Sequence, residues 1–409
     1  MSWLKKDVEY LLPAYHRLPL AITKGQGCYL YDDKDNAYLD MFSGVGVNQL
    51  GYNHPILINT IKEQSVQIIH SPLHFFTPSA IEYAEKLSEL STKGKVFFTT
   101  SGTEATEAAL KMLFKFKIRT NDERRKIIVL KNSFHGRTFG SLTFTRQESV
   151  YQDYPSNNLF DAIECSPNNI REFENLLRKE KPLAFMMEPV LGSGGIIPIE
   201  DSFIKRAKQL CEETNTIFVV DEIQTGMGRT GLLFSYQSAK VKPDIILFGK
   251  GAGGGIPLGG VIANKKISDT YNPGDHGTTW ANPPLATALG LTLLRVLIRN
   301  DFLNVKDKSS ILLDGLNIIK NKFPQIIKEI RYKGLMFGIT LSFTKKEAKE
   351  FQLKLLKNGV LVDIIQGNII RLLPPLIITE KEIYHFLTIL DETIINHQLN
   401  LTQRAAEVY

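Results

Sequence analysis

A lysine that follows a buried apolar run is the residue of this chain best placed to do chemistry. Lys250 comes directly after residues 245–248 and Gly249, and the glycine-rich residues 251–255 follow it. Ligands of open α/β sheets bind just outside the carboxyl ends of the strands. A lysine there can form a Schiff base with a carbonyl cofactor once burial or a nearby cation lowers its pKa. The alternative is a lysine that reaches solvent at a strand end, and this segment is compatible with both.

A second run, residues 95–100, ends at a helix start that could bind an anion. Ser101, Gly102 and Thr103 open the helix, and Ser101 with Glu104 fits a capping box. Free N–H groups and the helix dipole attract anions to such a start. Gly102 and Thr103 could therefore bind a phosphate, although a capped helix that binds nothing has the same pattern.

A third run, residues 217–220, ends at Asp221. A buried carboxylate is costly unless it is paired, so it needs an arginine or a protonated ring nitrogen, unless it only caps the turn. Gln224, three residues later, could donate to a ring oxygen. A Schiff-base lysine, a phosphate site and an acidic partner for a ring nitrogen together fit pyridoxal phosphate.

Two arginines could bind carboxylate groups of a substrate. Arg137 follows Phe134 at the end of the run 127–130, where the phenylalanine could stack on a planar cofactor and the arginine could clamp a carboxylate. The alternatives are a core phenylalanine and a surface ion pair. Arg371 lies in an apolar stretch and needs a carboxylate, from either the protein or a ligand.

The elements that position these residues predict an α/β fold. Short apolar runs, including residues 183–187 before Glu188, alternate with amphipathic stretches at 104–118 and 203–213. This alternation predicts a mostly parallel sheet with helices on both faces, so that five strand ends converge on one crevice.

The two ends of the chain predict a second, smaller α+β domain. Residues 28–48 contain a hairpin pattern, and the stretch from residue 300 onward contains a helix, a strand at 335–341, a helix at 345–357, short strands and a helix at 380–396. We expect segments 1–48 and 300–409 to form the small domain and segment 49–299 to form the large cofactor-binding domain.

The amino-acid composition argues against several classes of protein. The 409 residues include 49 basic and 43 acidic side chains, and the net charge of +6 is scattered, so we expect no nucleic-acid partner. Three widely spaced cysteines argue for a reducing compartment and against a disulfide frame or a metal site. We see neither a signal peptide nor a long apolar run, and therefore expect a cytoplasmic protein without a membrane partner.

The chain resembles the class III, or ω-amino, branch of fold-type I pyridoxal-phosphate aminotransferases, and looks closest to acetylornithine and ornithine aminotransferases. The segments that carry the resemblance are 24–32, 43–48, 51–55, 101–105, 134–138, 188–190, 221–231, 276–279 and 333–336. The resemblance implies a large domain with a mostly parallel, seven-stranded type of sheet and a smaller α+β domain. It also implies a homodimer with shared active sites.

The resemblance implies a role for individual residues. Lys250 would hold the cofactor and move protons, Asp221 would keep the ring nitrogen protonated, and Gln224 would contact the ring hydroxyl. The other cofactor-binding residues would be Ser101, Gly102, Thr103, Phe134, His135 and, from the other subunit, Thr279. The substrate-binding residues would be Val45, Arg137, Glu188, Ser193 and Arg371, with Arg137 on the donor's α-carboxylate and Arg371 on that of glutamate or 2-oxoglutarate.

One position departs from the family's usual pattern. Where ornithine and acetylornithine members usually have a second glutamate after Glu-Pro-Val, this chain has Ser193. A hydroxyl does not cancel the charge of a guanidinium, so we expect Arg371 to stay available. This argues against a bulky neutral donor such as acetylornithine.

We expect an aminotransferase that moves an amino group from an ω-amino donor, acetylornithine- or ornithine-like, to a 2-oxo acid, with 2-oxoglutarate favoured. 4-Aminobutyrate, lysine and diamines are alternative donors. A racemase or aminomutase on the same scaffold would share every cofactor residue but would consume no 2-oxo acid. A catalytically silent pyridoxal-phosphate protein is a further alternative, against which the intact Lys250, Asp221, Gln224 and Arg137 argue.

Overall fold

The structure is a computed structural model, and it describes residues 3–154 and 159–406. Residues 1–2, 155–158 and 407–409 lie outside the described residues, and they include the outermost positions of the predicted segments 1–48 and 300–409.

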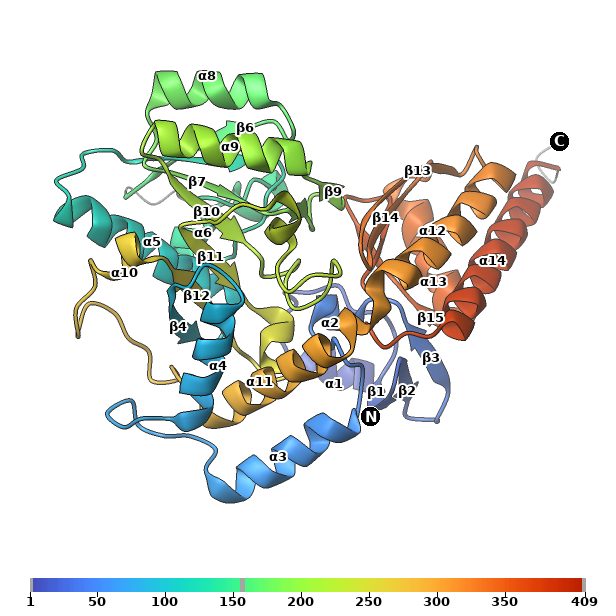
Figure 1. The fold of residues 1–409 in the computed structure, drawn as a ribbon. Coiled ribbons are helices and arrows are strands. Elements are labelled where there is room, and N and C mark those ends of the chain that lie inside the picture. Colours follow the sequence, from blue (N-terminus) through green and yellow to red (C-terminus); the bar gives the residue numbers. More distant parts are fainter. Residues whose placement is uncertain (1–2, 155–158, 407–409) are drawn as a thin grey trace.

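A seven-stranded sheet forms the centre of the molecule (Figure 1). Its strand order is β4 (Lys95–Thr99), β12 (Gly259–Ala263), β11 (Ile245–Phe248), β10 (Ile217–Asp221), β7 (Ala184–Met187), β5 (Lys126–Leu130) and β6 (Asp161–Cys165). Strand β12 is antiparallel to both of its neighbours, and the other neighbouring pairs are parallel. The six remaining strands therefore all end at the same edge, which confirms the predicted, mostly parallel sheet.

Helices cover both faces of this sheet, so its strands are apolar on both sides. In β10, Phe218 and Val220 pack in the same cluster as α8 (Ile170–Glu180) and α9 (Asp201–Glu213), which lie side by side in Figure 1. Ile217 and Val219 pack instead with α5 (Gly102–Arg119). The alternation is the period of two that a strand imposes.

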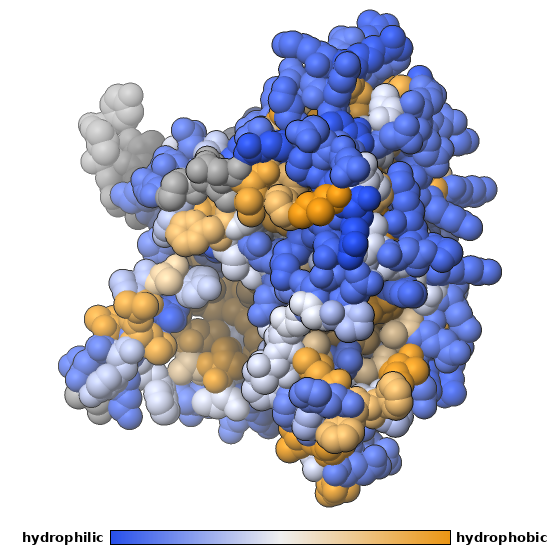
Figure 2. All heavy atoms as spheres, turned by 90° about the vertical axis from the view of Figure 1, so that its left-hand side faces the viewer, coloured by the Kyte–Doolittle hydropathy of each residue, from blue (hydrophilic) through white to orange (hydrophobic). Residues whose placement is uncertain are grey.

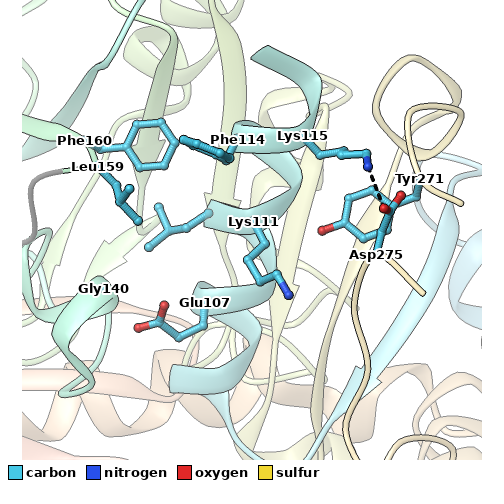
Figure 3. Close-up of a pocket in the computed structure, with 10 residues that line it drawn as sticks. Glu107, Lys111, Phe114, Lys115, Gly140, Leu159, Phe160, Tyr271 and Asp275 are labelled. Carbon is cyan, nitrogen blue, oxygen red and sulfur yellow. Dashed lines mark hydrogen bonds and ion pairs between the residues drawn. The ribbon is translucent and has the colours of Figure 1, made fainter. Parts of the chain in front are cut away.

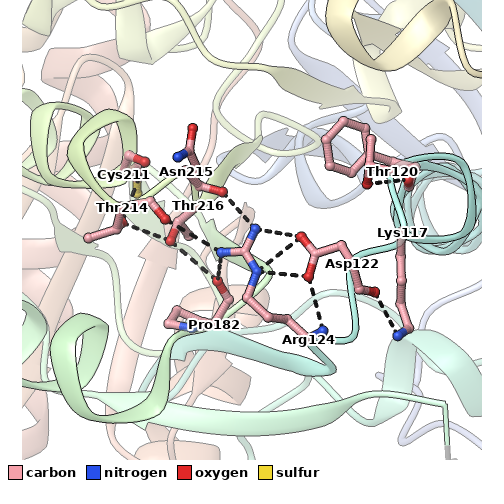
Figure 4. A network of polar contacts seen from close by, with 10 residues as sticks. Lys117, Thr120, Asp122, Arg124, Pro182, Cys211, Thr214, Asn215 and Thr216 are labelled. Carbon is pink, nitrogen blue, oxygen red and sulfur yellow. Dashed lines mark hydrogen bonds and ion pairs between the residues drawn. The ribbon is translucent and has the colours of Figure 1, made fainter.

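The opposite edge, where the strands begin, is held by Arg124 (Figure 4). Its guanidinium donates to both carboxylate oxygens of Asp122, to the carbonyl of Pro182 at 2.9 Å and to the carbonyl of Asn215 at 2.9 Å. These carbonyls precede β7 and β10, and Arg124 itself precedes β5. One side chain thus joins the starts of three strands, so the role of Arg124 is structural rather than catalytic.

The two ends of the chain meet in a second lobe. A four-stranded sheet has the order β1 (Ile22–Gln26), β2 (Tyr29–Asp32), β3 (Ala37–Asp40), β15 (Val360–Leu361). Strand β3 runs parallel to β15, with Leu39 opposite Val360. An antiparallel sheet of β13 (Ile327–Lys333), β14 (Met336–Leu341), β17 (Ile369–Leu372) and β16 (Asp363–Ile365) lies next to α12 (Val305–Lys322), α13 (Lys345–Lys357) and α14 (Glu380–Ala406) (Figure 1).

The remaining elements connect these sheets or pack around them. They are α1 (Trp3–Tyr10), α2 (Ser43–Gly46), α3 (Pro55–Gln67), α4 (Pro78–Glu89), α6 (Phe139–Leu142), α7 (Glu148–Tyr151), β8 (Val190–Leu191), β9 (Ile197–Pro198), α10 (Lys265–Ser268), α11 (Pro284–Arg299), and the 3₁₀ turns η1 (Ser235–Ala239), η2 (Lys250–Gly253) and η3 (Asp301–Asn304). The domain boundaries at 48/49 and 299/300 stay predictions.

Across residues 3–154 and 159–406, no helix has the length and apolar character needed to cross a membrane. The same residues contain no group of three or more histidine, cysteine, aspartate or glutamate side chains that could hold a metal ion. Cys28, Cys165 and Cys211 are buried free thiols, and burial raises the pKa of Cys165 to about 12.

Candidate active site

Several strand ends come into direct contact at one edge of the central sheet, because glycines allow close packing there. A Cβ atom on Gly249, after β11, would lie 3.4 Å from Cα of Gly102 and 3.3 Å from Cγ2 of Ile223. A Cβ on Gly102 would lie only 2.8 Å from the same methyl group. The start of α5 and the ends of β10 and β11 therefore touch one another, as the sequence predicts.

Lys250 begins η2 with a backbone φ of 49°, which is uncommon for a residue with a side chain. The residue is half-buried. Loss of water around the ammonium lowers the pKa of Lys250 from 10.5 to about 7, and the positive charge of Arg371 adds to the shift, while Glu188 and Asp221 oppose it. A large fraction of Lys250 is thus a neutral, nucleophilic amine near neutral pH.

Asp221 is 3% exposed and is fixed through both carboxylate oxygens. Nδ1 of His135 lies 2.7 Å from Oδ2, and the backbone N–H of Ile223 donates to Oδ1 at 3.0 Å. Because a carboxylate only accepts, the histidine donates from Nδ1. The opposite ring nitrogen of His135, Nε2, is buried and has no partner in the described part of the chain. His135 therefore orients a buried negative charge.

Gln224 and Glu188 occupy the space beside this pair. Oε1 of Gln224 is buried without a partner among the described residues, and a Cβ on Gly192 would lie 1.9 Å from it. Both oxygens of Glu188 accept backbone N–H groups, from Phe134 at 2.8 Å and from Gly192 at 3.2 Å. Burial raises the pKa of Glu188, and the nearby Asp221 raises it further. Glu188 joins two loops of the site.

The start of α5 presents its first backbone N–H groups at this edge, since those groups have no partner within a helix. The side chain of Ser101 accepts from the backbone of Glu104 at 3.3 Å, as predicted for a capping box. The reciprocal arm differs from the prediction, because the Glu104 carboxylate bonds the backbone N–H and the hydroxyl of Thr100, not Ser101. The hydroxyl of Thr103 accepts from the backbone of Arg137 at 3.2 Å, which brings residues 134–137 to the same place.

Phe134 and Arg137 lie together at the more open side of the site. The Arg137 guanidinium lies 5.8 Å from the centroid of the Phe134 ring. Phe134 is half-buried and Arg137 is exposed. The arginine is therefore accessible to a carboxylate from solvent.

Arg371 is buried in β17, and it already has a carboxylate partner. Its Nε and Nη2 both donate to Oδ2 of Asp363, at 3.0 and 2.6 Å. The expectation that Arg371 stays available because of Ser193 is therefore wrong for this structure, since a different residue pairs with it. Nη1 of Arg371 is buried and has no partner within the described residues.

Val45 and Ser193 border the second lobe. Val45 has a φ of 62°, which is costly for a β-branched residue, and it packs on a small cluster that includes Val190 and Leu373. Ser193 contacts the turn between β16 and β17 through its backbone, because its carbonyl accepts from Nε2 of Gln366 at 2.8 Å. Both residues thus lie near the strand that carries Arg371.

Thr279 is exposed, in the segment between α10 and α11, and it makes none of the contacts that join the other predicted site residues. That segment is held on the outer side of α5, where Lys115 forms an ion pair with Asp275 at 2.5 Å and Nζ of Lys111 lies 2.9 Å from Nδ1 of His276. A pocket of about 250 Å³ lies there, lined by residues of α5 together with Leu159, Phe160 and Tyr271 (Figure 3). This pocket is separate from Lys250.

Two charged residues near the site were not predicted: Asp363 contacts Arg371, and the charge of Arg229 acts on Lys250. Asp363 lies opposite Arg371 in the hairpin of β16 and β17, and the pattern of opposite charges placed symmetrically about Gly367 is a signal that could have found it. Arg229 is fully buried and donates to the carbonyl of Pro374 at 2.5 Å and to Oε1 of Gln49 at 2.8 Å. Burial lowers the pKa of Arg229 to about 9. Arg229 joins the loop after β10 to both ends of the chain.

The residues at this edge fit pyridoxal phosphate. A neutral lysine amine can condense with an aldehyde, a buried aspartate can pair with a protonated ring nitrogen, and a helix start can bind a phosphate. Two buried atoms without a partner among the described residues, Oε1 of Gln224 and Nε2 of His135, also leave hydrogen-bonding capacity for a ligand.

Comparison with known proteins decides the family. The family model for class-III aminotransferases matches residues 10–394. The chain is a class-III aminotransferase. An acetylornithine aminotransferase of Caldanaerobacter subterraneus subsp. tengcongensis is 39% identical over 390 residues, covering 95% of this chain and 98% of the relative. One from Aquifex aeolicus is 34% identical over 391 residues, covering 94% of this chain and 100% of the relative.

Solved structures agree with this class-III assignment. The ornithine aminotransferase of Toxoplasma gondii ME49 has a TM-score of 0.90 and 28% identity, covering 97% of this chain and 95% of the other. The acetylornithine aminotransferase of Elizabethkingia anophelis has a TM-score of 0.86 and 31% identity, covering 96% and 98%. The predicted fold type I, the cofactor pyridoxal phosphate and the aminotransferase activity are confirmed.

Proposed function

We propose that this aminotransferase takes the amino group of a terminal-amino donor, acetylornithine- or ornithine-like, and passes it to 2-oxoglutarate. The observation that carries the proposal is the presence of two arginines with different surroundings: Arg137 lies beside Phe134 and Thr103, and Arg371 lies on β17. Arg137 is exposed at the open side, and Arg371 is buried close enough for its charge to act on Lys250. The names of the relatives support this donor class.

In this proposal each residue of the chain has a defined task. Pyridoxal phosphate, when bound, supplies an aldehyde that condenses with amines and a ring that withdraws electrons. Lys250 accepts and returns the proton that moves during the reaction, because a base with a pKa near 7 can do both at neutral pH. Asp221 keeps the ring nitrogen protonated, with His135 fixing its carboxylate.

The remaining site residues bind and orient. Ser101, Gly102 and Thr103 would hold the phosphate, Phe134 would stack on the ring, and Gln224 would contact the ring hydroxyl.

On the substrate side, Arg137 would bind the donor's α-carboxylate and Arg371 that of glutamate or 2-oxoglutarate. Val45, Glu188 and Ser193 would shape the substrate space. The bonds from the backbones of Phe134 and Gly192 to Glu188 support this role, because they fix two loops of the site relative to each other.

We also propose a homodimer in which Thr279 completes the phosphate site of the partner. An exposed Thr279 supports this, as do exposed apolar side chains in the segments around residues 75 and 280. Phe75 and Phe76 are 68% and 93% exposed, and Trp280, 54% exposed, lies with its ring centroid 4.7 Å from that of His70. Figure 2 shows that apolar side chains gather in patches on the face that includes these segments. Sedimentation of the holoenzyme tests this, and a fully active monomer would exclude it.

The domain division and the location are also proposals. The pairing of β3 with β15 supports a small domain built from segments 1–48 and 300–409 around a large domain of residues 49–299. Three buried free thiols support a reducing, cytoplasmic location.

The experiment that tests the function is a donor screen on the holoenzyme. Acetylornithine, ornithine, 4-aminobutyrate, lysine and diamines are each added, and loss of the cofactor's visible absorbance identifies the donors. Each active donor is then incubated with 2-oxoglutarate, and one glutamate should form per donor consumed. Conversion of a donor without consumption of 2-oxoglutarate would indicate a racemase or an aminomutase instead.

A further inference from the structure

Arg371 and Asp363 form a partly buried ion pair in the small lobe. They are cross-strand partners in the β16–β17 hairpin, and Nε and Nη2 of the arginine both donate to one oxygen, Oδ2, of the aspartate. The arginine side chain is 7% exposed, so its charge has little water to stabilise it. Asp363 is therefore the group that neutralises this cation in the absence of a ligand.

One nitrogen of the Arg371 guanidinium, Nη1, can still donate a hydrogen bond to a ligand. Nη1 is buried without a partner among the described residues, whereas Nη2 and Nε are occupied by Asp363. A carboxylate binds an arginine best through two nitrogens. An incoming carboxylate must therefore either share Nη2 with Asp363 or displace it. In the first case two anions stand beside one cation, and in the second the existing pair is broken.

The surroundings of Asp363 allow its carboxylate to move away from Arg371. Its side chain is 26% exposed, against 7% for its partner, so the carboxylate can turn toward water when it leaves the arginine. The hairpin turn itself is held separately, through the bond from Gln366 to the backbone carbonyl of Ser193. The Ser193 side chain has no part in that bond, and the turn can stay in place while Asp363 moves.

We propose that Asp363 determines substrate specificity at the Arg371 position by competing with the second carboxylate of a dicarboxylic substrate. A ligand with one carboxylate, bound at Arg137, leaves the Asp363–Arg371 pair intact. A ligand with two carboxylates, such as glutamate or 2-oxoglutarate, binds more weakly by the cost of displacing Asp363. The inference rests on the proposed function only for the assignment of the two arginines to two carboxylates.

The test measures binding of two unreactive ligands to the holoenzyme by calorimetry. Glutarate has two carboxylates and pentanoate has one, with the same number of carbons. Asp363→Asn keeps the size of the side chain but removes its charge. We expect it to tighten glutarate binding about tenfold, equivalent to roughly 1.4 kcal/mol, and to change pentanoate binding by less than about twofold. Asp363→Glu restores the charge and should return glutarate affinity toward that of the wild type.

A matched control removes one negative charge from the same sheet at a different place. Glu329, on β13, has a side chain that is 54% exposed and lies 3.6 Å from Arg331, so Glu329→Gln should leave both affinities unchanged. Equal effects of Glu329→Gln and Asp363→Asn, weaker glutarate binding in Asp363→Asn, or no glutarate binding in any variant would each overturn the proposal. Because glutarate is not a substrate, this result does not depend on whether the enzyme consumes 2-oxoglutarate, and the two proposals can fail separately.

Discussion

Lys250 reacts as a nucleophile only in its neutral form. The fraction of Lys250 that is neutral at a given pH follows from its pKa. Burial and the charge of Arg371 lower the pKa of Lys250 from 10.5 to about 7. At pH 7.5 an amine with a pKa of 10.5 is neutral in about one molecule in a thousand, whereas one with a pKa of about 7 is neutral in about three quarters. We therefore expect Lys250 of the cofactor-free enzyme to react with acetic anhydride several hundredfold faster, by order of magnitude, than its ordinary pKa would allow.

The assay is trace acetylation across pH 5 to 11, followed by mass spectrometry of the peptide that contains Lys250. The exposed Lys179, whose side chain is 81% exposed, reports the behaviour of the reagent in the same digest. Reactivity of Lys250 should rise as pH increases through about 7, because the reactive form is the deprotonated one. Arg371→Met should move this midpoint to higher pH, since a neighbouring cation favours the neutral amine. A wild-type midpoint near 10.5, or one that Arg371→Met leaves in place, would refute the reasoning.

Three further changes test other parts of the site. Asp221→Asn should lower kcat by about two to four powers of ten, because the amide keeps its shape but cannot hold a ring nitrogen as a cation; a steady-state rate within tenfold of wild type would make Asp221 a structural residue. Thr279→Ala should weaken binding of pyridoxal phosphate to the dimer, as measured by equilibrium dialysis, and an unchanged dissociation constant would remove Thr279 from the phosphate site. Ser193→Glu should raise the ratio of kcat/KM for ornithine to that for glutamate only modestly, about twofold to fivefold, because Asp363 already pairs with Arg371; a much larger change would show that Asp363 leaves Arg371 exposed in solution.

Sequence patterns predicted the strands that carry chemistry because buried parallel strands are continuous apolar runs. Strands β6 and β12 were not predicted. Residues 161–165, Asp-Ala-Ile-Glu-Cys, form neither a continuous apolar run nor a regular alternation, and β12 begins with two glycines. A Cβ on Gly260 would lie 2.5 Å from the Phe248 ring, so the glycine is needed for packing and weakens the strand signal. Close packing in the folded state thus requires a glycine that makes β12 hard to predict from the sequence.

The predicted residues at the strand ends do come together, because parallel strands end at one edge. The side-chain contacts that individual site residues make are harder to predict from the sequence. His135 and Asp221 are 86 positions apart, and their contact depends on the loop conformation after β5. Arg371 was expected to need a carboxylate, but its partner depends on the register of a hairpin, and a shift of one residue would turn Asp363 to the other face.

Segments from the two ends of the chain pack together in the second lobe. This lobe can therefore form only after the later segment has been synthesised. The hydroxyl of Ser43 donates to the carbonyl of Leu373 at 2.6 Å, across 330 positions of sequence. At about 5 to 20 residues per second, a ribosome needs roughly 17 to 66 seconds to make the intervening chain. During that time the outer edge of β3 has no partner strand, and the strained Val45 lacks Leu373 against which it packs. Lys250 therefore emerges from the ribosome well before Arg371, and the reactive amine acquires its full surroundings only after the segment that carries Arg371 has been made.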